Sequence, residues 1–182
     1  PTPSPSHNYH SQPKALDDIA NRGKHKGIQV LKTMWNLRCL KTRVFTNMFD
    51  AQVQASLLYG AEIWGLRDLG KVEKTHTFLC KKFMGLDRRT PNHMVYGDLG
   101  RYPLTINSSV RSIRYWLKLC CMREERLPKQ AFLMLLNPCI KSGRNWAERV
   151  KLCLFQLGFG YAWLNSGVGD EKHFLSLVKQ RL

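Results

Sequence analysis

Residues 53–65, VQASLLYGAEIWG, form a stretch in which Glu62 is the only charged side chain. Apolar positions continue toward the N-terminus at steps of three and four residues, without the period-two alternation of a strand. Those steps fit the 3.6-residue turn of a helix, and Gly65 is a usual C-terminal stop. The sequence therefore predicts one central helix over residues 45–65, covered on both faces by other segments. A buried strand over residues 56–59 is the alternative.

Glu62 lies between Ala61 and Ile63 in this predicted helix. An unpaired carboxylate buried there would cost several kcal/mol, so we expect an Arg or backbone N–H partner. A catalytic role would require a second acidic or His side chain nearby, and the local sequence offers none. The pattern therefore favours a structural glutamate.

The chain carries a net charge of +16 over 182 residues, with 43% hydrophobic residues and a pI near 9.9. Its length is that of one domain with a real core. The positive excess predicts attraction to polyanions, with nucleic acid ahead of an anionic membrane surface. Residues 1–46 carry eight Lys/Arg against two Asp/Glu, residues 47–100 seven against six, and residues 101–182 fourteen against five. Two basic arms therefore flank a nearly neutral middle.

Helical periodicity recurs along the chain with almost no strand signal, which predicts an all-α bundle of six or more helices. Residues 1–13 hold four prolines and no periodicity, so we expect a disordered tail. Thr90 before Pro91 predicts an N-cap and a short helix to Leu99. We expect a subdomain break at Asn137-Pro138. One core is expected to hold or adjoin Trp64, Phe83, Leu99 and Trp116.

Two predicted helices carry basic side chains opposite their apolar stripes. Arg22 and Lys26 are four residues apart in the first helix, and Arg111, Arg114 and Lys118 recur at steps of three and four after Pro103. Backbone phosphates require only cations at helical repeats, and a neighbouring aromatic adds base stacking. These five residues are the candidate nucleic-acid contacts. A merely solvated helix face is the alternative for Arg22 and Lys26.

His76 and Cys80 stand four residues apart, the spacing at which one helix presents two zinc ligands. No second ligand pair follows at a suitable distance, so packed side chains are favoured over a metal site. The six cysteines show no CxxC pair, which favours free thiols over disulfides. We expect no catalytic residue, metal or cofactor in this chain.

Five motifs follow one another along the chain: LLYGAEIWG (57–65), EKTH (73–76), CKKF (80–83), TPN (90–92) and YGDLGRYPL (96–104). In order and spacing they resemble the region after the catalytic palm in reverse transcriptases of non-LTR (LINE-type) retrotransposons. The resemblance covers about residues 14–182. Its structural motif residues are Tyr59, Gly60, Glu62, Trp64, Gly97, Gly100 and Arg101.

The resemblance implies a thumb-like helical domain over residues 14–137 and a helical extension over residues 138–182. A thumb holds the template-primer, RNA and DNA, against an upstream palm. The parent polyprotein would be an RNA-directed DNA polymerase with an endonuclease. Its palm chemistry needs Mg²⁺ held by adjacent aspartates on a hairpin. Asp17-Asp18 lacks flanking strands, so this chain is not expected to be an enzyme on its own.

The start without an initiator Met indicates a fragment. No run reaches the eighteen or so apolar residues of a membrane span, so we expect no membrane partner and a location in the nucleus and cytoplasm. Two alternatives remain for function. One is a basic helical protein-interaction domain, which would need an exposed apolar patch. The other is a decayed copy of the element with no activity.

Overall fold

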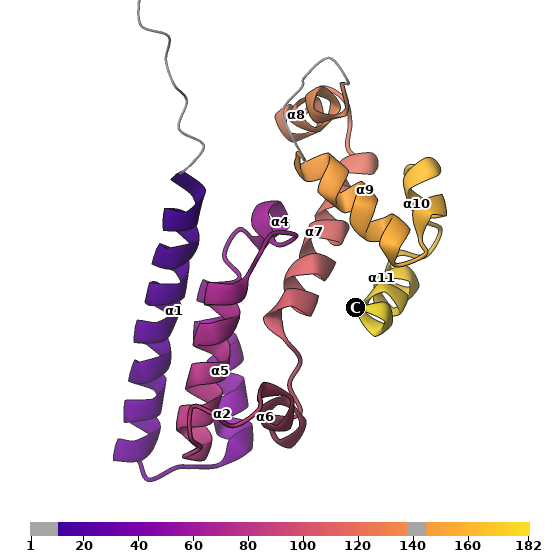
Figure 1. Cartoon of the computed structure of the whole chain (residues 1–182). Helices are drawn as coiled ribbons and strands as arrows, with labels where there is room; N and C mark the ends of the chain where they lie inside the picture. Colours follow the sequence, from indigo (N-terminus) through magenta and orange to yellow (C-terminus); the bar gives the residue numbers. More distant parts are fainter. Residues whose placement is uncertain (1–10, 138–144) are drawn as a thin grey trace, which may run out of the picture. The chain divides into compact units, whose positions relative to one another are not determined.

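Every regular element in the described part of the chain is a helix, as the periodicity predicts (Figure 1). The computed structural model describes residues 11–137 and 145–182. The predicted all-α fold of six or more helices is confirmed. Residues 1–10 of the expected disordered tail lie outside the described residues, and residues 11–13 already belong to the first helix.

The chain folds as two compact units. The first contains residues up to 59 together with residues 69–102, and the second contains residues 60–68 and 103–182. A short segment of the second unit therefore interrupts the first in sequence. The domain boundary expected at Asn137-Pro138 adjoins residues 138–144, which lie outside the described part, and it stays a prediction.

In the first unit, α1 packs against α5 and against the helical run that follows it after a turn at residues 37–41 (Figure 1). That run is α2, a π-helix η1 and α3 in direct succession. The helices of this unit are α1 (Ser11–Asn36), α2 (Thr42–Met48), η1 (Phe49–Gln54), α3 (Ala55–Leu57), α5 (Gly70–Met84) and α6 (Asn92–Leu99).

Two glycines allow α1 to lie close to its neighbours. A Cβ on Gly23 would overlap the side chain of Leu57, and a Cβ on Gly27 would overlap Leu79 of α5. Both leucines are fully buried. The glycines do not break α1, which runs continuously from Ser11 to Asn36. They serve packing, because the leucines fill the space that side chains would take.

The single helix predicted over residues 45–65 is wrong. The helical run ends at Leu57, and Gly60 takes a left-handed conformation with φ of 70° before α4 (Ala61–Trp64) begins. A glycine adopts positive φ at little cost, so the chain turns there. The two parts of the motif then belong to different units.

The second unit is built on α7, whose inward face packs with α8, α9 and α11. Trp116 of α7 stacks on Trp163, with ring centroids 5.5 Å apart. The helices are α4 (Ala61–Trp64), α7 (Leu104–Cys120), α8 (Leu127–Leu136), α9 (Trp146–Gln156), α10 (Gly160–Leu164) and α11 (Glu171–Arg181). The core residues are Ile113, Trp116, Leu117, Leu119, Phe132, Ala147, Val150, Leu154, Phe159, Ala162, Phe174, Leu175 and Val178.

Hydrogen bonds hold α4 on α7 and α9. The buried hydroxyls of Ser108 and Ser112 donate to the carbonyls of Gly65 and Ala61, at 3.0 and 2.9 Å. The indole N–H of Trp146 donates to the carbonyl of Glu62 at 2.9 Å. These bonds tie backbone carbonyls of α4 and its C-cap to the two longer helices; the carbonyl of Ala61 also accepts from the backbone N–H of Gly65 at 2.7 Å.

Several packing expectations are corrected. Glu62 is only half-buried, so its carboxylate does not need a buried partner. Tyr59 and Ile63 are exposed, so the central stretch of residues 53–65 is not covered on both faces. Pro91, not Thr90, is the N-cap of α6. There is no single core: Phe83 and Leu99 belong to the first unit and Trp64 and Trp116 to the second.

Substitution of Gly23 tests the close packing of α1. We expect Gly23→Ala to lower the free energy of unfolding by about 1–3 kcal/mol, the usual cost of overpacking, since the new methyl group meets Leu57. Gly97→Ala in α6 is the matched control, because nothing lies within 4 Å of its Cβ position. It should raise stability by about 0.5–1 kcal/mol. Equal effects in urea unfolding would contradict the packing role of Gly23.

Candidate nucleic-acid interface

One groove of the first unit, of ≈ 510 Å³, brings Arg22 and Lys26 together with Tyr59. We call it the α1 groove. One wall is α1, and the other is η1, α3 and the turn that follows. Tyr59 is 73% exposed. The groove is lined by Arg22, Lys26, Gln29, Ala51, Gln52, Ala55, Ser56 and Tyr59.

The α1 groove follows from helical spacing. Arg22, Lys26 and Gln29 are four and three residues apart, so they share one side of α1. The opposite wall presents the small side chains of Ala51, Ala55 and Ser56, which leave the space open. The two predicted basic residues of α1 therefore face a hollow rather than open solvent.

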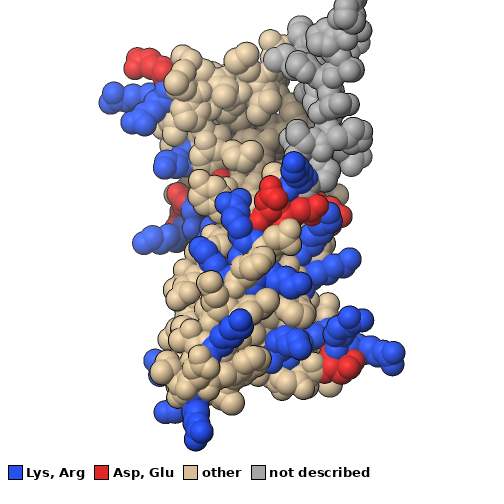
Figure 2. Space-filling model, turned by 90° about the vertical axis from the view of Figure 1, so that its left-hand side faces the viewer, with Lys and Arg blue, Asp and Glu red and all other residues tan. Residues whose placement is uncertain are grey.

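The surface around α1 is strongly positive. Residues 19–49 contain seven Lys or Arg and no Asp or Glu, and all seven are exposed. Figure 2 shows the side of the molecule on which α1 lies in Figure 1, with many more basic than acidic side chains. Clustered like charges of this kind raise the local concentration of polyanions.

A second basic hollow of the first unit, of ≈ 990 Å³, was not predicted. We call it the α5 hollow. Lys74, Lys81, Lys82 and Arg88 line it, and the ammonium of Lys81 donates to the carbonyl of Arg88 at 3.0 Å. Its acidic member, Asp87, accepts a hydrogen bond from the backbone N–H of Arg89. The seven-residue spacing of Lys74 and Lys81, two helical turns, was the signal available in the sequence.

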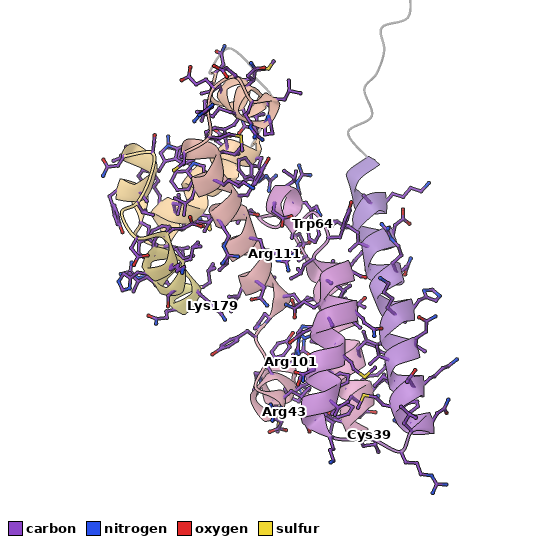
Figure 3. All side chains as sticks on the ribbon, turned by 180° about the vertical axis from the view of Figure 1, so that it is seen from behind. Cys39, Arg43, Trp64, Arg101, Arg111 and Lys179 are labelled. Atoms are coloured by element: carbon purple, nitrogen blue, oxygen red, sulfur yellow. The ribbon has the colours of Figure 1, made fainter. Side chains whose placement is uncertain are left out.

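The basic stripe predicted on α7 varies more in exposure and in surrounding charge than the cations of the α1 groove. Arg114 and Lys118 are exposed, whereas Arg111 is half-buried. Arg114 lines a hollow of ≈ 800 Å³ together with the basic side chains of Lys172 and Lys179 and the acidic side chains of Asp170 and Glu171. Mixed signs make this hollow a weaker phosphate site than the α1 groove. Figure 3 labels Arg111 on α7 and Lys179 on α11 within the second unit.

A buried polar network centres on Arg101, which follows α6 (Figure 3). Its side chain is 8% exposed. Its guanidinium donates to Asp50 at 2.5 Å, to Gln54 at 2.9 Å and to Nε2 of His76 at 3.2 Å. It also lies 4.5 Å from the ring centroid of Phe49. Arg101 therefore joins η1 to α5.

The network fixes the tautomer of His76. Because Nε2 accepts from Arg101, the ring proton is on Nδ1 and donates to the carboxylate of Glu73 at 3.1 Å. Glu73 also accepts from the hydroxyl of Tyr96. Both ring nitrogens thus have protein partners, and the His76–Cys80 spacing is that of packed side chains.

The other motif residues have structural positions. Gly60 and Gly100 take positive φ, at the turn before α4 and at the C-cap of α6. Gly97 lies within α6, while Glu62 and Trp64 lie half-buried in α4. Of the motif set, Tyr59 lines the α1 groove and Arg101 centres the buried network.

Within residues 11–137 and 145–182, no three His, Cys, Asp or Glu side chains are placed to hold a metal ion. Asp17 pairs with Lys71. The described cysteines, which exclude Cys139, are free thiols, as the spacing predicts. In the same part of the chain, none of the helices has the length and apolar character that a bilayer span needs.

The chain matches no protein-family model, no curated protein and no solved structure. The assignment of the site therefore depends on its own geometry and charge.

Arg101→Lys tests the buried network. Arg101 reaches His76 through Nε and reaches Asp50 and Gln54 through Nη2. The single Nζ of a lysine cannot occupy both positions, so at least one acceptor, such as the buried ring of His76, loses its partner. We expect a loss of about 2–3 kcal/mol in the free energy of unfolding, measured by urea titration. Arg89→Lys, at an exposed arginine of the same unit, should change stability by less than about 0.5 kcal/mol. Similar losses in both variants would contradict the central role of Arg101.

Alkaline pH should destabilise the first unit. Burial raises the pKa of the Cys80 thiol from 9.0 to about 12, and burial with the hydrogen bond to Glu73 raises the pKa of Tyr96 above 10.0. The folded state therefore holds these protons more tightly. The contribution of Cys80 is complete below pH 9 and is lost as pH rises toward 12, by about 1.4 kcal/mol per pH unit. The contribution of Tyr96, which is half-buried, is lost as pH rises above 10. Urea titrations at a series of alkaline pH values should give a flatter profile for Cys80→Ala and for Tyr96→Phe than for the parent chain. If the free energy of unfolding falls with pH as steeply in both variants as in the parent chain, Cys80 and Tyr96 are not the cause of the alkaline destabilisation.

Proposed function

We propose that the chain binds the sugar–phosphate backbone of nucleic acid and positions it without carrying out chemistry. The α1 groove and the basic surface around it are the main contact. The motif resemblance adds a context, in which the chain acts as the thumb-like and C-terminal part of a retrotransposon-type reverse transcriptase. In that context its ligand is a template-primer of RNA and DNA, and a palm with Mg²⁺ belongs to the parent polyprotein.

One observation carries the proposal: seven exposed cations and no acid over residues 19–49, beside a groove that holds two of those cations. Two aspartates of this unit form ion pairs with basic side chains outside residues 19–49. Asp17 pairs with Lys71, and Asp50 pairs with Arg101. The basic surface therefore keeps its charge for an external anion. Phosphate contacts of this kind fix register and carry little sequence information.

Affinity should fall steeply with salt, because each neutralised phosphate releases counterions. We expect Arg22→Gln with Lys26→Gln to weaken binding to RNA and DNA of any sequence and to lower the slope of log K against log salt by roughly 0.7–0.9 per lost contact. Fluorescence anisotropy with labelled oligonucleotides measures both quantities. We expect a smaller effect from replacing Arg111, Arg114 and Lys118, because acidic side chains share the hollow of Arg114.

The matched control removes two positive charges from the second unit instead of the α1 groove. Arg123 and Arg126 are exposed in the second unit beside Glu124 and Glu125. Arg123→Gln with Arg126→Gln should leave affinity nearly unchanged. Equal losses in the control and in the α1 groove variant would mean that only net charge acts, and the groove assignment would be wrong. Arg181 is unsuitable as a control, because it donates to the carbonyl of Leu157 and lies over Phe159.

A second candidate function, a protein-interaction domain, is favoured by α8. Leu127, Leu133, Met134 and Leu136 are exposed, at 78%, 42%, 63% and 43%, while Phe132 is buried. Exposed apolar side chains of this density are typical of protein contacts. A parent chain that binds no nucleic acid but associates with protein, and an association that is lost in Leu133→Gln with Met134→Gln, would favour this candidate.

A further inference from the structure

The α1 groove contains an exposed aromatic ring, which binding to a backbone alone does not require. Tyr59 is 73% exposed and lies next to Gly60, whose left-handed conformation turns the chain. A tyrosine offers an apolar face on which any base can stack, while its hydroxyl remains in water. The groove therefore combines a stacking surface with two phosphate-binding cations.

The two walls give the groove a polarity. Leu57 packs on Gly23, and the chain reaches Leu57 by running back along α1 from the turn at residues 37–41. Tyr59 therefore lies toward Arg22, and Gln52 lies toward Gln29. Stacking and charge are at one end of the groove, and two amides are at the other.

We infer that the α1 groove binds an unpaired nucleotide of a single strand. This inference rests on the proposed function and names its substrate class. Tyr59 stacks on the base, Arg22 and Lys26 hold the flanking phosphates, and Gln29 and Gln52 offer donors and acceptors to the base edge or sugar. The volume of ≈ 510 Å³ lies within the range of about 300–1,000 Å³ typical of small-molecule pockets. Bases stacked inside a duplex cannot reach Tyr59, so the groove distinguishes single strands from duplexes.

Binding of the full 182-residue chain to a labelled single strand of about 12 nucleotides, within the usual site sizes, and to the matching duplex tests the inference. We expect Tyr59→Leu to weaken single-strand binding by about tenfold, which corresponds to ~1.4 kcal/mol, and to leave duplex binding unchanged. Tyr59→Phe should bind like the parent chain, because the ring remains. Tyr161→Leu removes an exposed tyrosine of the second unit and should change neither affinity.

Each result separates the inference from the proposed function. If Tyr59→Leu has no effect while Arg22→Gln with Lys26→Gln weakens both ligands, the stacking inference is wrong and backbone binding stands. Equal losses for single strand and duplex in Tyr59→Leu also overturn the inference. If the charge variant binds normally, both proposals fail. Circular dichroism spectra and urea midpoints of the variants show whether a loss comes from unfolding. If Tyr59→Leu is unstable, Tyr59→Gln, which also removes the ring, takes its place, and the same selective loss of single-strand binding is expected.

Discussion

The first unit depends on the contacts that the guanidinium of Arg101 makes between two of its helices. It contacts Asp50 and Gln54 of η1 and His76 of α5, and it lies over the ring of Phe49. A buried cation is tolerated only where acceptors surround it, so this contact fixes the relative position of the two elements. The same η1 presents Ala51 and Gln52 to the α1 groove. The network that stabilises the unit therefore also holds one wall of its candidate binding site.

The short element η1 serves both sides because its side chains point in different directions around the helix. Positions four residues apart lie on one face, and the intervening positions lie on others. Asp50 and Gln54 meet Arg101, while Ala51 and Gln52 line the groove. On the other wall, Gly23 allows Leu57 to pack directly against α1. Close packing thus depends on a glycine of α1, and the open groove depends on small side chains of the opposite wall.

The basic side chains fall into two groups: those with partners inside the fold, and those that form the proposed contact surface. Arg101 and Lys71 are committed to Asp50 and Asp17, and Arg181 is held by a backbone carbonyl and an aromatic ring. Seven exposed cations lie between Asp18 and Asp50 with no acid among them, and Arg22 also donates to the backbone carbonyl of Asp18 at 3.3 Å. The hollow of Arg114 contains Lys172 and Lys179 together with Asp170 and Glu171. Net charge alone does not distinguish these groups. Their surroundings decide which of them can meet a phosphate.

The sequence by itself determined the helical class, the end of α6 at Leu99 and the shared helix face of Arg22 and Lys26, because periodicity, proline and glycine act over a few neighbouring residues. It did not determine that residues 53–65 divide between two units, since an apolar run looks the same whether it continues as a helix or turns at Gly60. Nor did it indicate the Arg101 network, whose members are up to 51 residues apart. The tertiary structure alone placed Tyr59 in the same groove as Arg22, because that arrangement depends on how closely α1 and α3 pack.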